Sequence, residues 1–147
     1  MQRGCTVLSL SLGGDKLPAL FKERRLPPRL LIVDDSRVSR MMIRARVLAL
    51  QPDWAFQEAA SGDEALLIAA QSFPDYVTMD VNMPGLNGFD AAEQLSKLSP
   101  NTRIVMLTAN IQESSRARAE SIGLKFVQKP ITDTSMQQVI AYLTAQP

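Results

Sequence analysis

Short apolar runs alternate with longer amphipathic stretches from about residue 30 to the end of this 147-residue chain. Each run is three to five residues long, which suits a short buried strand, and each following stretch is long enough for a helix of several turns. This alternation is typical of successive strand-helix units around a parallel sheet. The pattern therefore predicts an α/β fold with one five-stranded parallel sheet.

Capping serines and helix-ending prolines set the expected boundaries of the helices and strands. Ser36 and Ser61 precede helical stretches as N-caps, while Pro52 and Pro74 end them. The apolar side of the first helix is expected to hold five residues, which are Val38, Met41, Met42, Ala45 and Leu48. The predicted strands are 30–33, 55–59, 76–80, 103–107 and 126–128, and the predicted helices are 36–50, 61–73, 89–98, 112–122 and 132–143.

Several large apolar side chains are assigned to the core. Trp54 precedes the predicted strand 55–59 and Phe56 lies within it. Phe73 ends the predicted helix 61–73, and Met41 and Met42 lie within the first helix. Large apolar and aromatic side chains are more often buried than exposed. We expect all five to pack inside the domain.

Residues 1–29 differ in texture from the rest and are predicted to be a flexible N-terminal extension, with the domain spanning 30–147. The extension contains Gly13-Gly14, Pro18 and Pro27-Pro28 and has no sustained period of 2 or 3.6 residues. Residues 1–30 carry a net charge of +4 and the remainder −3. A solvated tail explains the basic segment Lys22-Glu23-Arg24-Arg25 better than contact with an anionic surface, and a small strand or helix that docks on the domain is the alternative for the extension.

The amino-acid composition excludes several kinds of catalytic and metal site. The chain has no histidine and one cysteine, Cys5, so it cannot build a histidine-dependent nucleophile, a histidine-ligated metal site or an internal disulfide. No apolar run approaches the roughly 20 residues that span a bilayer. We expect a cytoplasmic protein with no membrane insertion, whose chemistry runs on carboxylates, hydroxyls and lysine.

Polar residues end the predicted strands, where α/β folds collect their ligands. Asp34 and Asp35 follow the first strand, Asp80 ends the third, Thr108 follows the fourth, and Lys129 follows the fifth. Three converging carboxylates repel one another unless a cation lies between them, and oxygen ligands at an open edge suit Mg²⁺. Mg²⁺, Lys129 and Thr108 could each interact with one phosphoryl oxygen. An aspartate can then act as the nucleophile in phosphoryl transfer.

Four motifs resemble those of the response-regulator receiver domain of two-component signalling, a flavodoxin-like, CheY-like three-layer sandwich. They occur in order as Leu31-Ile32-Val33-Asp34-Asp35-Ser36, Met79 to Gly88, Val105-Met106-Leu107-Thr108-Ala109, and Lys129-Pro130. The resemblance implies strand order 2-1-3-4-5 and a cis Lys129-Pro130 bond. It also implies phosphorylation of Asp80, with Mg²⁺ held by Asp35, Asp80 and the backbone carbonyl of Asn82, and with Asp34 acting through water.

The resemblance further implies a switch in which Thr108 moves toward the phosphoryl group and Phe126 rotates into the space it leaves. The surface formed by helix 112–122, strand 126–128 and helix 132–143 would change with it.

The expected function is that of a single-domain response regulator, not a classical enzyme. Its expected partners are a histidine kinase or phosphotransfer protein and a downstream protein target, with no nucleic acid. One alternative is a receiver-like binding module that is never phosphorylated. The other is a Mg²⁺-dependent hydrolase that forms an aspartyl phosphate, although such enzymes carry an Asp-x-Asp-x-Thr motif, where this chain has Asp34-Asp35-Ser36.

Overall fold

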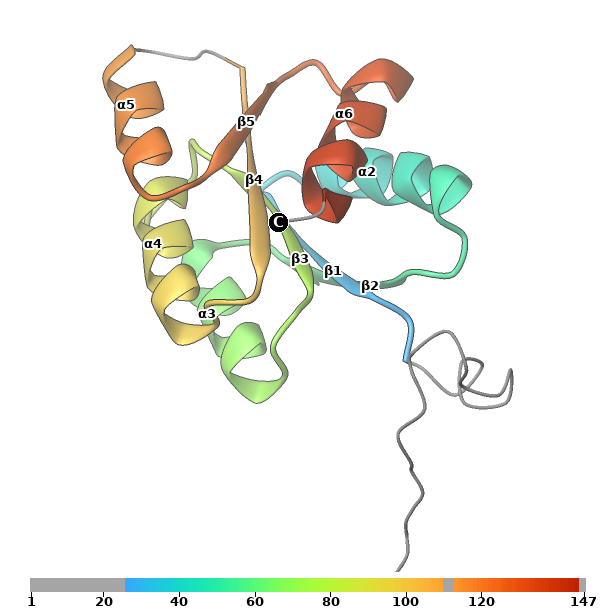
Figure 1. Ribbon diagram of the computed structural model, residues 1–147, viewed down its shortest axis with the longest axis horizontal. Coiled ribbons are helices and arrows are strands. Elements are labelled where there is room, and N and C mark those ends of the chain that lie inside the picture. Colours follow the sequence, from blue (N-terminus) through green and yellow to red (C-terminus); the bar gives the residue numbers. More distant parts are fainter. Residues whose placement is uncertain (1–25, 110–112, 146–147) are drawn as a thin grey trace, which may run out of the picture.

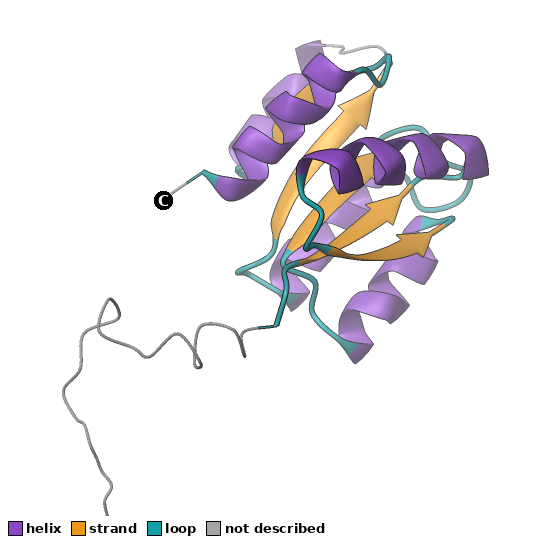
Figure 2. Cartoon of the chain, turned by 90° about the vertical axis from the view of Figure 1, so that its right-hand side faces the viewer, coloured by secondary structure: helices purple, strands orange, loops and turns teal. Residues whose placement is uncertain are grey.

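The computed structural model describes residues 26–109 and 113–145. They form a five-stranded parallel sheet in the order β2-β1-β3-β4-β5, with helices on both faces (Figures 1 and 2). The predicted fold class and strand order are both confirmed. The extension predicted at 1–29 lies outside the described residues except for its last four.

The observed elements match the predicted ranges to within two residues. The strands are β1 (Arg29–Val33), β2 (Ala55–Ala59), β3 (Tyr76–Asp80), β4 (Arg103–Thr108) and β5 (Lys125–Gln128). The helices are α2 (Arg37–Leu50), α3 (Gly62–Gln71), α4 (Gly88–Leu98), α5 (Glu113–Ser121) and α6 (Asp133–Thr144). None of the helices in the described part of the chain is long and apolar enough to cross a membrane.

Side-chain caps fix where the helices begin. The hydroxyl of Ser36 accepts the N–H of Ser39 at the start of α2, and the hydroxyl of Ser61 accepts the N–H of Glu64 at the start of α3. A cap of this kind satisfies one of the backbone donors that the first turn leaves unpaired. Because each cap lies within three residues of a strand end, it also restricts how the chain leaves the sheet.

Two apolar clusters flank the sheet. Helices α2 and α6 cover one face (Figure 1), where Ile43, Val47 and Met136 belong to the same buried apolar cluster as Leu30 and Ile32. Helices α3, α4 and α5 cover the other, where Leu95 and Ala119 are fully buried. The central strands are buried on both sides, which explains why their sequences are continuous apolar runs and do not alternate.

The expected packing of α2 is wrong. The residues that face the sheet are Ile43 and Val47, whereas Val38, Met41, Met42, Ala45 and Leu48 are all exposed. The helix carries two apolar stripes, and periodicity reports each stripe without saying which one meets the sheet. The connection from β1 and the cap at Ser36 decide the rotation of the helix.

The aromatic assignments are confirmed only in part. Trp54 is buried and its ring lies 4.8 Å from that of Tyr76, whereas Phe56 is only half-buried. Phe73 was also assigned to the core, and this is wrong, because it is 55% exposed in the turn between α3 and β3. That turn lies at the rim of the sheet, where no helix covers it.

Candidate functional site

The carboxyl ends of the parallel strands bring the predicted site residues to one edge of the sheet. A carboxylate oxygen from each of Asp34, Asp35 and Asp80 lies within 4.8 Å of the other two. We refer to these three residues as the site aspartates. Asp34 and Asp80 are buried and Asp35 is exposed, so the group opens to solvent on one side.

Asp34 is the most firmly held of the three. One carboxylate oxygen accepts the N–H of Ser36 at 2.9 Å, and the other accepts the hydroxyl of Ser39 at 2.7 Å. Its backbone carbonyl accepts the guanidinium of Arg40 at 2.7 Å. With so many of its acceptor positions occupied, Asp34 is fixed in place and is less available to a metal than Asp35.

Lys129 is the cation of the site. Its ammonium lies 3.1 Å from a carboxylate oxygen of Asp34 and 3.5 Å from one of Asp80. The lysine is positioned by its own backbone N–H, which donates to the carbonyl of Thr108 at 2.7 Å, and the bond to Pro130 is cis. The implied cis isomer is therefore present.

The charges at the site do not balance. Three carboxylates face one ammonium, and burial raises the pKa of Asp80 above its ordinary value. The attraction of Lys129 lowers that pKa, while repulsion from Asp34 and Asp35 raises it further. The surplus negative charge is what a hard divalent cation with oxygen ligands would neutralise, so the donor set fits Mg²⁺.

Gly88 supports the site in a way that the sequence analysis missed. A Cβ atom on Gly88 would lie 2.0 Å from the backbone carbonyl oxygen of Asp80, so only glycine allows α4 to begin so close to the end of β3. In the sequence, the dipeptide Asn87-Gly88 is typical of an ordinary turn. The close approach of Gly88 to the Asp80 carbonyl appears only when β3 and α4 are packed together. Ser39 and Arg40 were also missed, although their place in the first turn after Asp34 was the available signal.

Thr108 and Phe126 lie on one face of the sheet. Phe126 pairs in register with Met106, two residues before Thr108. Since side chains two residues apart along a strand share a face, Thr108 and Phe126 are diagonal neighbours. Thr108 is buried, and the Phe126 ring packs edge-on against Phe89 of α4 with 5.8 Å between the centroids.

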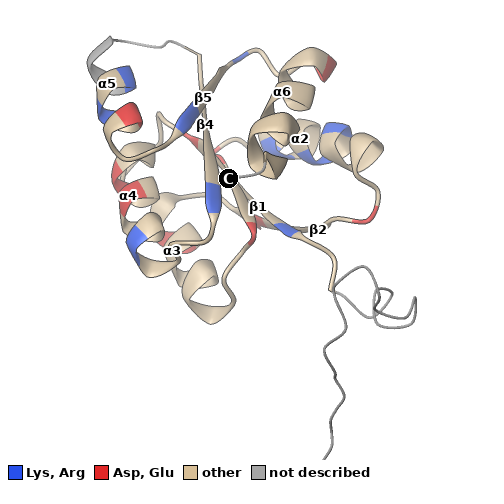
Figure 3. Cartoon of the chain, viewed as in Figure 1, with Lys and Arg blue, Asp and Glu red and all other residues tan. Residues whose placement is uncertain are grey.

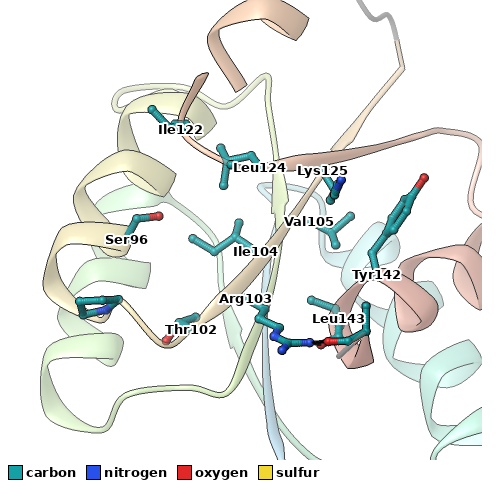
Figure 4. A pocket seen from close by; sticks show the side chains of 13 residues that line it. Ser96, Thr102, Arg103, Ile104, Val105, Ile122, Leu124, Lys125, Tyr142 and Leu143 are labelled. Carbon is teal, nitrogen blue, oxygen red and sulfur yellow. Dashed lines mark hydrogen bonds between the residues drawn. The ribbon is translucent and has the colours of Figure 1, made fainter. Parts of the chain in front are cut away.

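The described structure also contains a hollow of about 430 Å³ that has no part in this site. It lies at the opposite end of the sheet, between the first residues of β4 and β5 and the last turn of α6 (Figure 4). Ile104, Leu124 and Leu143 supply much of its wall, and Arg103 lies across the end of α6. None of the site aspartates lines it.

The sequence pattern that describes the response regulator receiver domain matches residues 30–141. This chain belongs to that family. The receiver domain is 34% identical to the chemotaxis protein CheY of Thermotoga maritima, and the match covers 76% of this chain and 93% of that protein. It is 40% identical over 106 residues to a protein-glutamate methylesterase/protein-glutamine glutaminase of Anaeromyxobacter dehalogenans, of which it spans only 30%.

Comparison with solved structures supports the assignment to the receiver family. The receiver domain superposes with a TM-score of 0.70 and 25% identity on a response regulator protein from Burkholderia pseudomallei, covering 80% of this chain and 67% of that one. That protein was crystallised with a phosphorylated aspartic acid, a calcium ion and citrate. The family assignment thus rests on sequence and structure together.

Proposed function

We propose that this receiver domain is a phosphorylation switch whose acceptor is Asp80. The observation that carries the proposal is the convergence of three carboxylates and one ammonium at the carboxyl ends of β1, β3 and β5. An isolated aspartate at a strand end would need no such surroundings. A structural relative that holds a phosphorylated aspartic acid and a calcium ion adds support.

The donor is the phosphohistidine of a histidine kinase or a phosphotransfer protein. A carboxylate oxygen of Asp80 attacks phosphorus, the P–N bond breaks, and the imidazole nitrogen of the donor keeps the electron pair. Phosphoryl transfer needs charge neutralisation and an in-line nucleophile more than covalent machinery. The domain supplies both, so it catalyses the transfer from the donor to its own Asp80 and is not a classical enzyme.

The metal site uses Asp35, Asp80 and the backbone carbonyl of Asn82, with Asp34 acting through water. Mg²⁺ bound there would neutralise negative charge on the transferring phosphoryl group. The ammonium of Lys129 pairs with a second phosphoryl oxygen, and the Thr108 hydroxyl donates a hydrogen bond to a third. The hydrogen bonds that Asp34 receives from Ser36 and Ser39 fit its more distant role.

The signal leaves through a protein-binding surface formed by α5, β5 and α6. When Thr108 moves toward the phosphoryl group, Phe126 rotates and the contacts of α5 change. Helix α5 is held to α4 by Arg118, which pairs with Asp90 and with Glu93 and lies over the Phe89 ring. Because Phe89 also touches Phe126, a rotation of Phe126 reaches this attachment directly.

The test is phosphorylation by acetyl phosphate with Mg²⁺, followed by intact-mass measurement. The wild-type chain is expected to gain one phosphoryl group, and Asp80→Ala none. Asp63→Ala removes an exposed carboxylate on α3 and serves as the control that keeps the gain. A wild-type chain that gains no mass with a competent donor is a binding module and not a switch, and sustained turnover of a phosphate ester would make it a hydrolase.

A further inference from the structure

Ser39 and Lys129 share one carboxylate oxygen of Asp34. The Ser39 hydroxyl donates to Oδ2 of Asp34 at 2.7 Å, and the Lys129 ammonium reaches the same oxygen at 3.1 Å. The other oxygen, Oδ1, accepts the backbone N–H of Ser36 at 2.9 Å. The carboxylate is therefore held by a lysine, a hydroxyl and a backbone amide, and the first two of these donors meet at Oδ2.

The carboxylate of Asp34 has little access to water. Its side chain is 1% exposed, whereas that of Lys129 is 23% exposed. A buried carboxylate oxygen that loses a donor destabilises the protein, because water does not reach the oxygen to replace that donor. Asp34 thus opposes a movement of Lys129 away from it, unless another donor stays in place.

Phosphorylation of Asp80 requires such a movement of Lys129. The ammonium lies 3.1 Å from Asp34 and 3.5 Å from Asp80, and in the proposed transfer it pairs with a phosphoryl oxygen. To do so it must give up part of its contact with Oδ2 of Asp34. The rate of phosphorylation then depends on how well that oxygen is stabilised once the lysine has moved.

Ser39 is placed to stay beside Asp34 when Lys129 moves. Its backbone N–H donates to the hydroxyl of Ser36 at 3.2 Å, within the cap that begins α2. Ser39 is partly buried and belongs to this first helical turn, whereas Lys129 follows the end of β5. Because the two donors come from different elements, a shift of the lysine leaves the bond from Ser39 to Asp34 intact.

The Ser39 hydroxyl is a neutral donor on a helix whose charged residues are all basic. Helix α2 carries four arginines and no acidic residue (Figure 3). Arg40, next to Ser39 in the chain, bonds the backbone carbonyl of Asp34 and pairs with Glu58, so its guanidinium is bound to other groups. A hydroxyl stabilises the carboxylate of Asp34 without adding a positive charge that would repel Lys129.

We infer, on the basis of the proposed function, that Ser39 is a positioning residue that lets Lys129 move from Asp34 to the phosphoryl group. Before the transfer, Ser39 and Lys129 together stabilise Oδ2 of Asp34. During the transfer, the hydroxyl keeps this oxygen paired while the ammonium turns to the phosphoryl oxygen. Ser39 acts through Asp34 and Lys129 and not on phosphorus.

Initial rates of phosphorylation by acetyl phosphate at saturating Mg²⁺, measured from intact-mass spectra, test this role. Ser39→Ala is expected to slow phosphorylation about tenfold, because a hydrogen bond to a charged group is lost when Lys129 moves. Ser39→Thr retains a hydroxyl and should restore most of the rate. Ser61→Ala removes the capping hydroxyl of the neighbouring helix α3 and should leave the rate unchanged. Circular dichroism confirms that each variant is folded.

A double-mutant cycle separates this role from a general structural one. Ser39→Ala is also introduced into a Lys129→Gln chain, in which no ammonium has to leave Asp34. The effect of Ser39→Ala is expected to fall below about twofold there, because both residues act on one oxygen. Equal slowing in the two backgrounds, or a wild-type rate in Ser39→Ala, overturns the role of Ser39 and leaves the phosphorylation switch standing. A wild-type chain that gains no phosphoryl group overturns both.

Discussion

Glu58 on β2 and the site aspartates at the ends of β1 and β3 lie in the same sheet, yet their negative charges are compensated to different degrees. Glu58 on β2 has two arginines within 3.4 Å, so one carboxylate receives two cations. At the end of β1 and β3, three carboxylates share Lys129. Glu58 therefore has more positive charge beside it than it needs for neutralisation, whereas the three site aspartates have too little.

The difference shows which part of the fold can gain stability by binding a cation. Carboxylates gathered without enough cations destabilise the folded state, and burial of Asp80 adds to the penalty. Any ligand that brings positive charge to that edge relieves it. The Glu58 cluster has nothing to gain from such a ligand, and its arginines are held by the same chain. This contrast can be broken or sharpened by four experiments.

Removing Lys129, the only cation that pairs with the site aspartates among the described residues, should have the largest effect. Lys129→Gln is expected to slow phosphorylation by acetyl phosphate by about 10² to 10³, since one preorganised donor to a developing charge is lost. Lys125→Gln removes an exposed lysine from β5 and should leave the rate unchanged. Initial rates from intact-mass spectra measure both, and equal rates in the two variants would remove Lys129 from the mechanism.

Adding Mg²⁺ should stabilise the domain through the site alone. A ligand at 100 times its dissociation constant raises the free energy of unfolding by about 2.7 kcal/mol. We expect this rise in wild-type protein and most of it to disappear in Asp35→Asn, whereas Glu58→Gln should retain it. Urea unfolding with and without Mg²⁺ gives the values, and a rise that survives in Asp35→Asn would place the metal elsewhere.

Neutralising Asp80 should stabilise the metal-free domain. Because the pKa of Asp80 is raised in the folded state, the folded state binds a proton more tightly than the unfolded state. Stability is therefore lost as pH rises from the ordinary aspartate pKa through the raised value, and the loss persists above it. At neutral pH, Asp80→Asn should be more stable than wild type by about 1 kcal/mol.

That advantage should shrink as the pH falls from the raised pKa of Asp80 to the ordinary pKa of an aspartate, and it should be absent below the ordinary value. Thermal unfolding in EDTA across this range measures it. An Asp80→Asn variant that is less stable than wild type at neutral pH would show that Lys129 compensates the carboxylate fully.

Neutralising Glu58 should have the smallest effect and the opposite sign. Glu58→Gln leaves Arg40 and Arg44 without a carboxylate, and partly exposed pairs contribute about 0.5 to 1 kcal/mol. The variant should lose that amount of unfolding free energy in low salt and less in high salt. A gain in stability would mean that Glu58 is under the same strain as the site aspartates, and the contrast would fail.

The sequence alone determined the fold class, the strand order implied by the family motifs, and the identity of the residues at the sheet edge. The fold class and the residues at the sheet edge follow from local signals, because buried strands must be apolar and the ends of parallel strands must meet at one edge. The strand order came only from the resemblance to the family. Asp34, Asp35, Asp80, Thr108 and Lys129 could all be chosen in this way. Their roles in phosphorylation stay predictions until the experiments are done.

Tertiary structure decided what local signals leave open. The rotation of α2 put Ile43 against the sheet and left Met41 outside, although both lie in apolar stripes of one helix. The need for glycine at position 88 comes from the carbonyl of Asp80, eight residues away in the chain. Both depend on which surfaces meet when the layers pack, and hydrophobic periodicity carries no information about the facing surface.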